Sequence, residues 1–571
     1  MKNILLTIGI FILTLSSSCK KGITDFLDKP PGVDVTEDTI FSSKAQVETF
    51  LATTYYSGVA IHMNPNYFCY GEIAGACDEG EMGQDWHYTN LWNTADISAN
   101  DIVGWGEDFI FYDRWSTVRR TNIIIERIDG VPGVDQAYKD QVKGEAKFIR
   151  ALSYFEMLKR YGGVPIIDKR FNAGDDLNVT RSTVEDCVNF IVKDCDEAAG
   201  SLPSAYPANL TGRITRGAAL MLKAKTLLYA ASPLFNTGTP YLNFGSNNNL
   251  ICYGNFDKAR WQLAADAAKA VLDWAPTAGC SLITNQGVDK NYRYAWEHYD
   301  NSEIILAEKA QDNSDYWALP FGNLMPPSMY GSWGGITPTL NFLKFYEKKD
   351  GTPQTWNPSG GNDLNEKYAE LDPRFAQSIA YNGSFWNEDY PIIQTFDGGN
   401  QAGFCVGGEW VHKLVPASFR GEASSGAIPN WILFHLAEAY VSYAEALNEA
   451  QGPVQEAYDA LNIIRARSGM PPLPAGLSQD QFRVRARNER AVELAFEDQR
   501  FWDIRRWLIG ENDGVMKGNM YGLKITAIPA SNDFHYQPYV FEVRSFYPKE
   551  YLHPWPTSEI NKGYFIQNPG W

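Results

Sequence analysis

The sequence predicts a mostly α-helical protein in which helices pack as antiparallel pairs, with long loops concentrated in two regions. Apolar residues recur at helical spacing through much of the chain, and Gly or Pro separates the helical segments. Each pair can bury its apolar stripe only against its neighbours, as in a tetratricopeptide-like array, although no clean repeat of about 34 residues occurs. Two long stretches without a sustained period, residues 64–108 and 296–431, are typical of functional loops.

Length and composition indicate a large globular protein and argue against one class of partner. At 571 residues the chain exceeds the roughly 250–300 residues at which one core stops growing, so it holds several domains or an extended array. Its 44% hydrophobic and 21% charged residues are typical of a globular protein. The net charge of −18 argues against a nucleic-acid partner, because binding phosphates needs a basic patch.

The first residues have the pattern of a bacterial export signal over residues 1–18. Lys2 is followed by the apolar run Ile4–Leu15 and then by Ser16-Ser17-Ser18-Cys19. Small residues before a Cys are typical of a lipobox, so we expect Cys19 to carry a lipid; the alternative is an ordinary secretory signal. The apolar run is too short to span a bilayer, which takes about 20 residues, and no other segment is a candidate.

Helices are predicted in order along the N-terminal half. Each combines apolar residues at i, i+3 and i+4 with a Gly or Pro near its end, as where Gly162-Gly163 follows Tyr161. The predicted helices cover residues 43–56, 109–129, 138–161, 183–199, 217–231 and 256–271. In the second loop region, β-prone runs at Ile304–Leu306 and Ile392–Phe396 predict small hairpins. Residues 508–571 are predicted to be irregular.

The segment from Trp431 to Trp507 is predicted to be the helical scaffold. Two helices, Leu433–Leu447 and Val454–Ile464, are separated by Gly452-Pro453 and form a hairpin. A third helix is predicted from Leu477 to Trp507, with Ser478 as its N-cap ahead of Gln481.

Charged residues of this third helix recur at helical spacing. Because each carboxylate has an Arg three or four residues away, we interpret the set as an ion-pair lattice rather than a catalytic acid/base pair, since a general acid needs a raised pKa. The residues are Glu489, Arg490, Glu493, Glu497 and Arg500.

Four carboxylates gather in the first loop region, at Asp78, Glu79, Glu81 and Asp85. Two carboxylates facing a sugar would suit a glycosidase, and several oxygens would suit calcium. The spacing does not reproduce a calcium loop, so a solvated acidic loop is the favoured interpretation. The sequence contains no CxxC motif and no His pair at i, i+4, so no zinc site is expected. We expect no cofactor, and calcium is the one metal left open.

Aromatic side chains of the two loop regions are the better ligand candidates. Sugar rings stack on Trp and Tyr, while amides and carboxylates bind their hydroxyl groups. The alternative is that each ring packs between loop and scaffold, as most large rings do. The predicted ligand-binding residues are Asp78, Trp86, Tyr88 and Trp92 in the first region and Tyr316, Trp317, Tyr330 and Trp333 in the second.

Three motifs resemble the signatures of the SusD/RagB family. Residues 145–165, from Glu145-Ala146-Lys147-Phe148-Ile149-Arg150 to Tyr161-Gly162-Gly163-Val164-Pro165, resemble its N-terminal signature. Residues 488–507, with Asn488-Glu489-Arg490 and Arg500-Phe501-Trp502-Asp503, resemble its C-terminal signature. The tail Gln567-Asn568-Pro569-Gly570-Trp571 is similar to the way these proteins end. The resemblance extends from the lipobox to the last residue.

The resemblance implies a SusD-like α-superhelix of tetratricopeptide-like helix pairs with a loop-rich ligand face and small β hairpins. It implies one domain over residues 19–571, with the helix pairs in residues 19–295 and the loop-rich part and signature helices in residues 296–571. The implied function is that of a non-enzymatic outer-membrane lipoprotein, lipid-anchored and exposed at the cell surface. Such a protein binds an oligosaccharide and delivers it to a SusC-like TonB-dependent transporter. A binder of peptide or another nutrient, a surface glycoside hydrolase and a pure helical scaffold remain as alternatives.

Overall fold

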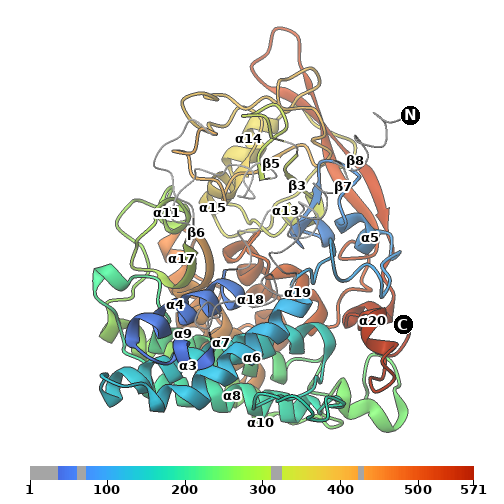
Figure 1. The fold of residues 1–571 in the computed structure, drawn as a ribbon. Coiled ribbons are helices and arrows are strands. Elements are labelled where there is room, and N and C mark those ends of the chain that lie inside the picture. The colour runs from blue at the N-terminus through green and yellow to red at the C-terminus, as the bar shows by residue number, and fades with distance from the viewer. Residues whose placement is uncertain (1–35, 61–72, 310–323, 333, 422–429) are drawn as a thin grey trace, which may run out of the picture.

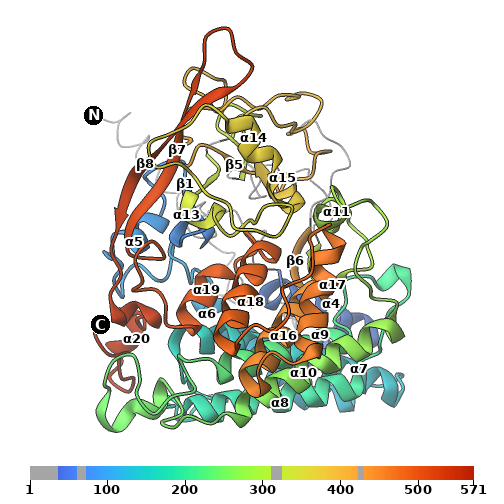
Figure 2. The ribbon, with the colours of Figure 1, turned by 180° about the vertical axis from the view of Figure 1, so that it is seen from behind.

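The computed structural model describes residues 36–60, 73–309, 324–332, 334–421 and 430–571. A helical array forms the lower half of the molecule in Figures 1 and 2, and loops, short helices and small antiparallel sheets form the upper half. The prediction of a mostly helical protein with loop-rich regions is therefore confirmed. The predicted export signal and Cys19 lie outside the described residues. Within the described residues, no helix combines the length and the apolar character needed to cross a membrane.

The array is built largely in chain order, because each helix packs on the next. It runs through α4 (Lys44–Gly58), α6 (Phe111–Arg127), α7 (Gln136–Tyr161), α8 (Val184–Ser201), α9 (Arg216–Ala231) and α10 (Ala259–Trp274). From α10 it passes to α16 (Leu436–Gln451), which packs on α17 (Gln455–Arg467) and α18 (Gln479–Glu493). The six helices predicted in the N-terminal half are confirmed to within about one turn at each end. The predicted N-cap Ser478 is also confirmed, because it forms a capping box with Gln481.

The two glycines that end α7 allow chain segments to approach closely. Gly162 has φ +75°, and a Cβ at this position would lie 2.5 Å from the Leu250 carbonyl oxygen. A Cβ at Gly163 would lie 2.0 Å from the Ser182 carbonyl oxygen. Nearby, the Asn568 side-chain amide donates to the Tyr161 carbonyl oxygen at 3.1 Å. The motif at the end of α7 and the C-terminal tail, far apart in sequence, therefore meet.

The predicted third scaffold helix is wrong as a single element. It ends at Glu493, and α19 (Arg500–Arg506) follows a turn in which Phe496 and Asp498 have φ of +62° and +58°. The Phe496 backbone N–H donates to the Glu79 carboxylate at 2.7 Å instead of continuing the helical pattern. A contact from a distant loop thus outweighs local helix propensity.

The predicted strands are partly wrong. Strand β2 (Ile304–Lys309) contains the run predicted at 304–306, but it pairs with β6 (Asn430–His435), which occupies the start of the helix predicted at 433–447. The predicted hairpin at 392–396 is not a strand. Residues 508–571, predicted to be irregular, contain the longest strands, β7 (Gly518–Ala527) and β8 (Phe534–Arg544), which form a hairpin. Pairing between segments distant in sequence has no local signature, and β8 is only partly buried, so its alternation is weak.

A buried ion-pair lattice joins the scaffold helices to the loop-rich half. Arg374, at the start of α15 (Pro373–Ser378), donates to Glu489 at 2.6 Å and to Glu493 at 3.1 Å, both on α18. Arg465 of α17 also binds Glu489, at 2.8 Å. The prediction of a structural lattice is confirmed. The predicted partners within one helix are wrong, because most of the partners come from other elements.

Candidate ligand-binding surface

The two predicted loop regions meet at a short antiparallel sheet. Strand β1 (Gly80–Met82) lies in the first region and pairs with β3 (Ile336–Pro338) in the second region. Just beyond β1, the Gly83 backbone N–H donates to the Gly335 carbonyl oxygen at 2.9 Å. The fold therefore brings the first region, with Trp86, next to the part of the second region around β3. Tyr316, Trp317 and Trp333 lie outside the described residues.

Trp86 presents its ring at the surface beside this sheet. Its side chain is 43% exposed, its indole N–H donates to the Gln84 side-chain oxygen at 2.8 Å, and its ring stacks on His87 at 3.9 Å between centroids. The hydrogen bond and the stacking contact orient the ring before any ligand arrives. Tyr88, two residues later, is only half-buried and packs against the main apolar core. Trp86 is thus the more accessible of these two predicted residues.

Tyr330 lies within a polar cluster in the second region. Its hydroxyl donates to the Asp389 carboxylate at 2.7 Å and accepts from the Asn387 amide at 2.9 Å, and its ring meets Tyr390 edge-to-face at 5.1 Å. Its φ of +52° is a left-handed conformation that costs a non-Gly residue about 1–2 kcal/mol. These contacts hold the residue in that conformation. Next to Tyr390, a hollow of about 480 Å³ is lined by Ser328, Asp389, Tyr390, Pro391, Ile392, Gln394, Asn400 and Gln401.

Phe404 is an exposed ring that sequence reasoning missed. Its side chain is 56% exposed, and its backbone has φ +62°. The Phe404 carbonyl oxygen lies 3.2 Å from where a Cβ at Gly83 would be, which places residue 404 beside the end of β1. An apolar ring in the Gly-rich run 398–408 was the available signal in the sequence. We use the term loop surface for Gln84, Trp86, Tyr330, Asp389, Tyr390 and Phe404.

Asp78 and Trp92 are corrections to the predicted site, because each is only 1% exposed. The Asp78 carboxylate accepts two hydrogen bonds from Arg500, at 2.8 and 2.7 Å. The Trp92 ring meets Phe501 edge-to-face at 5.4 Å and lies 4.7 Å from the ring of His553. Both side chains fix the first loop region to the C-terminal helices and cannot reach a surface ligand.

The predicted solvated acidic loop is also wrong, since Glu79 and Glu81 are buried together with Asp78. Burial raises the pKa of Glu79 to about 8, against the lowering effect of the hydrogen bond from the Phe496 N–H. Glu81 pairs with the buried Arg544. Among the described residues, no group of three or more His, Cys, Asp or Glu side chains is arranged to hold a metal ion. The acidic residues therefore serve the fold, and nothing in the described geometry favours the calcium site left open above.

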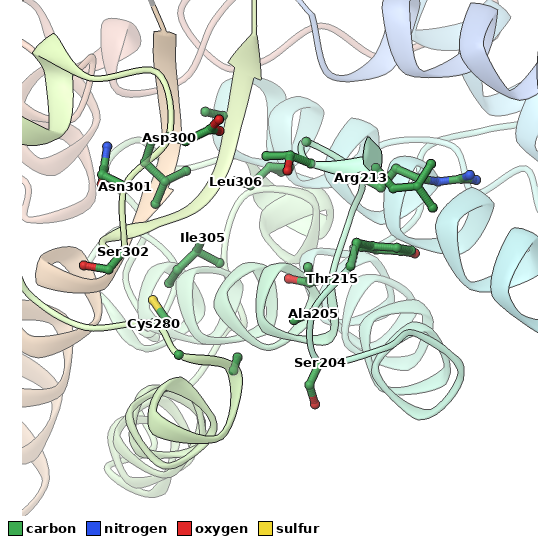
Figure 3. Close-up of a pocket in the computed structure, with 18 of the residues that line it drawn as sticks. Ser204, Ala205, Arg213, Thr215, Cys280, Asp300, Asn301, Ser302, Ile305 and Leu306 are labelled. Carbon is green, nitrogen blue, oxygen red and sulfur yellow. The ribbon is translucent and has the colours of Figure 1, made fainter. Parts of the chain in front are cut away.

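A second hollow, of about 370 Å³, lies below β2 between the loop that precedes α9 and the end of α10. Figure 3 shows Asp300, Asn301 and Ser302 on one of its sides and Ser204, Ala205 and Thr215 on the other. Several of its polar side chains already have partners. Asp300 pairs with Lys309 at 3.0 Å, and the Ser302 hydroxyl donates to the Ser281 carbonyl oxygen at 3.0 Å. A ligand would find few free hydrogen-bonding groups here, so the loop surface is the better candidate.

Glu409 is a buried carboxyl whose raised pKa does not mark a catalytic site. Burial raises the pKa of this carboxyl to about 8, against the lowering effect of the Tyr368 hydroxyl, which donates to it at 2.5 Å. Glu409 is completely buried at the start of β5 (Trp410–Val411) and lines none of the hollows described here. Its shifted pKa therefore reflects burial and not contact with a substrate.

Replacing Glu409 with Gln is expected to change how stability depends on pH. Between pH 4.5 and about 8 the unfolded chain has released this proton while the folded protein retains it, so folding stability falls as the pH rises through that window. Gln cannot ionise and still accepts from Tyr368. We expect Glu409→Gln to match the wild type near pH 4.5 and to exceed it by about 2–4 kcal/mol at pH 8.5. Urea unfolding at both pH values measures this, and equal stabilities at pH 8.5 would contradict the shift.

Comparison with known proteins identifies the family. A model described as the SusD family matches residues 284–571, and another, described as starch-binding associating with outer membrane, matches residues 25–228. A SusD-like protein of Formosa agariphila is 23% identical, over 87% of this chain and 88% of its own. The crystal structure of a SusD-like protein from Bacteroides fragilis is 27% identical with a TM-score of 0.78, covering 95% of this chain and 100% of that one.

A laminarin-binding SusD-like protein shares the fold at 19% identity and a TM-score of 0.60, covering 93% of this chain and 100% of that one. The first family model spans half of the chain and includes α17, α18 and α19, where the C-terminal motif lies. Together with the motifs at the end of α7 and in the tail, this match shows that the chain belongs to the SusD family.

Proposed function

We propose that this protein is a non-enzymatic outer-membrane lipoprotein, anchored through Cys19, that binds an oligosaccharide on its loop surface. In this proposal it delivers the sugar to a SusC-like TonB-dependent transporter. The observation that carries the proposal is the exposed Trp86 ring, oriented by Gln84 and His87, on a loop-rich face of a SusD family chain. The alternative of a peptide or other nutrient binder uses the same fold and is separated by experiment below.

The chemistry of the loop surface suits a sugar. An exposed indole offers a flat apolar face for the C–H groups of a pyranose ring, and Phe404 offers another. The exposed Asp389 and Asn400, which line the hollow beside Tyr390, supply the acceptors and donors that hydroxyl groups need. The laminarin-binding neighbour and the family described as starch-binding support this class of ligand.

Two carboxylates near Tyr390 are placed to accept hydrogen bonds. Glu388 and Asp389 both lie near Arg420, at 2.5 and 3.6 Å. Their remaining acceptor sites suit the hydroxyl groups of a sugar.

Replacing Trp86 or Phe404 with Ala is expected to weaken oligosaccharide binding by about tenfold each, since stacking on one ring contributes roughly 0.5–1.5 kcal/mol beyond the area it buries. Both side chains are exposed, so the melting temperature should stay within about 2 °C of the wild type. Tyr56→Ala, an exposed ring on α4, is the control and should bind normally. A glycan array followed by calorimetry with the best-bound sugar gives the affinities.

The same experiment separates the alternatives. Release of reducing sugar from a bound glycan would identify a hydrolase and refute the proposal. Binding of peptides without binding of any glycan would identify a different nutrient. Unchanged affinity in both Trp86→Ala and Phe404→Ala would place the sugar elsewhere. Delivery is tested by co-purification with a TonB-dependent transporter, which should retain the wild-type protein.

A further inference from the structure

A third hollow lies in the helical array. Its residues come from around α10, α16 and α18, which lie in the lower half of the molecule in Figure 2. It has a volume of about 540 Å³ and forms where the start of α10, the end of α16 and the first half of α18 meet. Helices α10 and α18 both pack on α16, so they flank the hollow as two walls. The lining residues are Pro233, Phe256, Lys258, Trp261, Glu449, Gln479, Arg483 and Arg487.

One wall is a polar stripe of α18. Gln479, Arg483 and Arg487 follow one another at four-residue intervals, which places them on the same side of the helix. Arg483 is already neutralised, because its guanidinium donates to Glu449 at 2.7 Å and also pairs with Asp480. Glu449, the one carboxylate that lines the hollow, is therefore already paired with Arg483.

Arg487 has no such partner. Among the described residues, no carboxylate lies within ion-pair distance of its guanidinium, and its Nε atom is buried without a hydrogen-bond acceptor. Its closest described charge contact is the ring of Trp507, 4.4 Å from the guanidinium carbon. Burial lowers the pKa of Arg487 to about 10, so the group remains charged at neutral pH. A buried Nε–H group without an acceptor is costly unless a ligand supplies one.

Lys258 adds a second unused positive charge. It is exposed at the N-cap of α10, and no ion pair or hydrogen bond of its ammonium group is found in the part of the chain that the structure describes. Among the described residues, the hollow therefore carries two cations without an ion pair, in a protein of net charge −18. Such a local reversal of charge favours an anionic ligand.

The hollow also offers an aromatic face. Phe256 is 66% exposed at its rim, although a ring of this size is usually covered, and Trp261 forms part of the wall. A simple anion would use the two cations and leave this ring in water. A ligand that combines a negative group with a flat apolar face would use both features.

We propose that this hollow is a second binding site, for an acidic saccharide whose carboxylate or sulfate binds Arg487 and Lys258 while its ring stacks on Phe256. The inference rests on the proposed function only for the choice of a sugar as the molecule that bears the negative group. A volume of about 540 Å³ lies within the roughly 300–1,000 Å³ of small-ligand sites. The site is separate from the loop surface, so the two can be tested independently.

Calorimetric titration of the whole protein tests the site. The probes are trigalacturonate, a sulfated galactotriose and neutral galactotriose, with sodium sulfate and a Glu-rich hexapeptide as competitors. We expect both acidic sugars to bind at least tenfold more tightly than the neutral one, and their affinity to fall as NaCl is raised from about 50 to 500 mM. Similar affinity for the two acidic sugars would assign the site to negative charge in general, and a preference for one would name the group it selects.

The variants localise the effect. Lys258→Glu and Phe256→Ala change exposed side chains and should weaken trigalacturonate binding about fivefold each. Arg487→Gln should weaken it at least tenfold. The matched control is Lys290→Glu, an exposed lysine at the N-cap of α11 (Asn291–Glu297), which should bind like the wild type. Because Lys258 and Phe256 are exposed, their result stands even if the Arg487 variant is unstable.

Several results would overturn the proposal. They are equal binding of neutral and acidic trisaccharides, equal loss in Lys290→Glu and Lys258→Glu, and displacement by sodium sulfate at the concentration of the acidic sugar. Tighter binding of the hexapeptide would assign the hollow to a protein partner instead. Loss of trigalacturonate binding in Trp86→Ala but not in Lys258→Glu would place the acidic sugar on the loop surface. Failure of the loop-surface proposal shows separately, as absent binding of any neutral glycan.

Discussion

Replacing Arg374 with Met is expected to lower the free energy of unfolding by about 3–5 kcal/mol, because three buried carboxylates lose the guanidinium they share. Arg374 is 1% exposed and binds Asp372 at 2.7 Å, Glu489 at 2.6 Å and Glu493 at 3.1 Å. Arg465 and Arg467 neutralise part of the charge on α18, but Asp372 has no other partner among the described ion pairs. Urea unfolding followed by tryptophan fluorescence measures the loss.

The matched control is Lys269→Met on α10. Lys269 pairs with Asp273 on the surface of one helix, and exposed i,i+4 pairs contribute only about 0.3–0.5 kcal/mol. A similar small change in both variants would mean that the buried carboxylates rearrange or take up protons. In that case the lattice would not hold the loop-rich half on the scaffold.

Replacing Trp502 with Ala is expected to cost about 3–5 kcal/mol of stability while leaving ligand preference unchanged. Trp502 is buried in α19, where Lys159 and Arg160 of α7 lie 4.5 and 4.8 Å from its ring and His553 stacks on it at 5.5 Å. Removing the ring leaves a cavity and takes away the aromatic face that both cations contact. The loop surface is built from other elements and should keep its geometry in the protein that remains folded.

Trp86→Ala is the converse of this variant, because it should lose sugar binding and keep its stability. Measuring unfolding and glycan affinity on both proteins gives a crossed test with two large and opposite effects. If Trp502→Ala kept normal stability and lost sugar binding, the assignment of the scaffold and ligand faces would be reversed.

The two stability effects have one structural meaning. The lattice around Arg374 joins α17 and α18 to α15, and Trp502 joins α19 to α7. Charged and aromatic side chains of the C-terminal motif therefore form tertiary contacts that hold together segments far apart in the chain. Their role is to position the loop surface on a rigid array, as binding sites require.

Most helices could be predicted from the sequence because their signals are local. Apolar spacing, capping residues such as Ser478 and the glycines after Tyr161 act over a few residues, and the structure keeps them where the pattern places them. The ion-pair interpretation of Glu489 and Glu493 was also accessible, since carboxylates that alternate with arginines on a buried helix need compensation. The motifs further identified the family.

Only the tertiary structure decided which residues face a ligand and which partners the charges take. Trp86 and Trp92 stand six positions apart in one loop region, yet the first is exposed and the second lies between Phe501 and His553. Asp78 belongs to Arg500, more than 400 residues away, as its hydrogen bond shows. Which side chains are buried and which charges pair depends on segments that come together only in the folded protein. The spacing of residues along the chain does not contain this information.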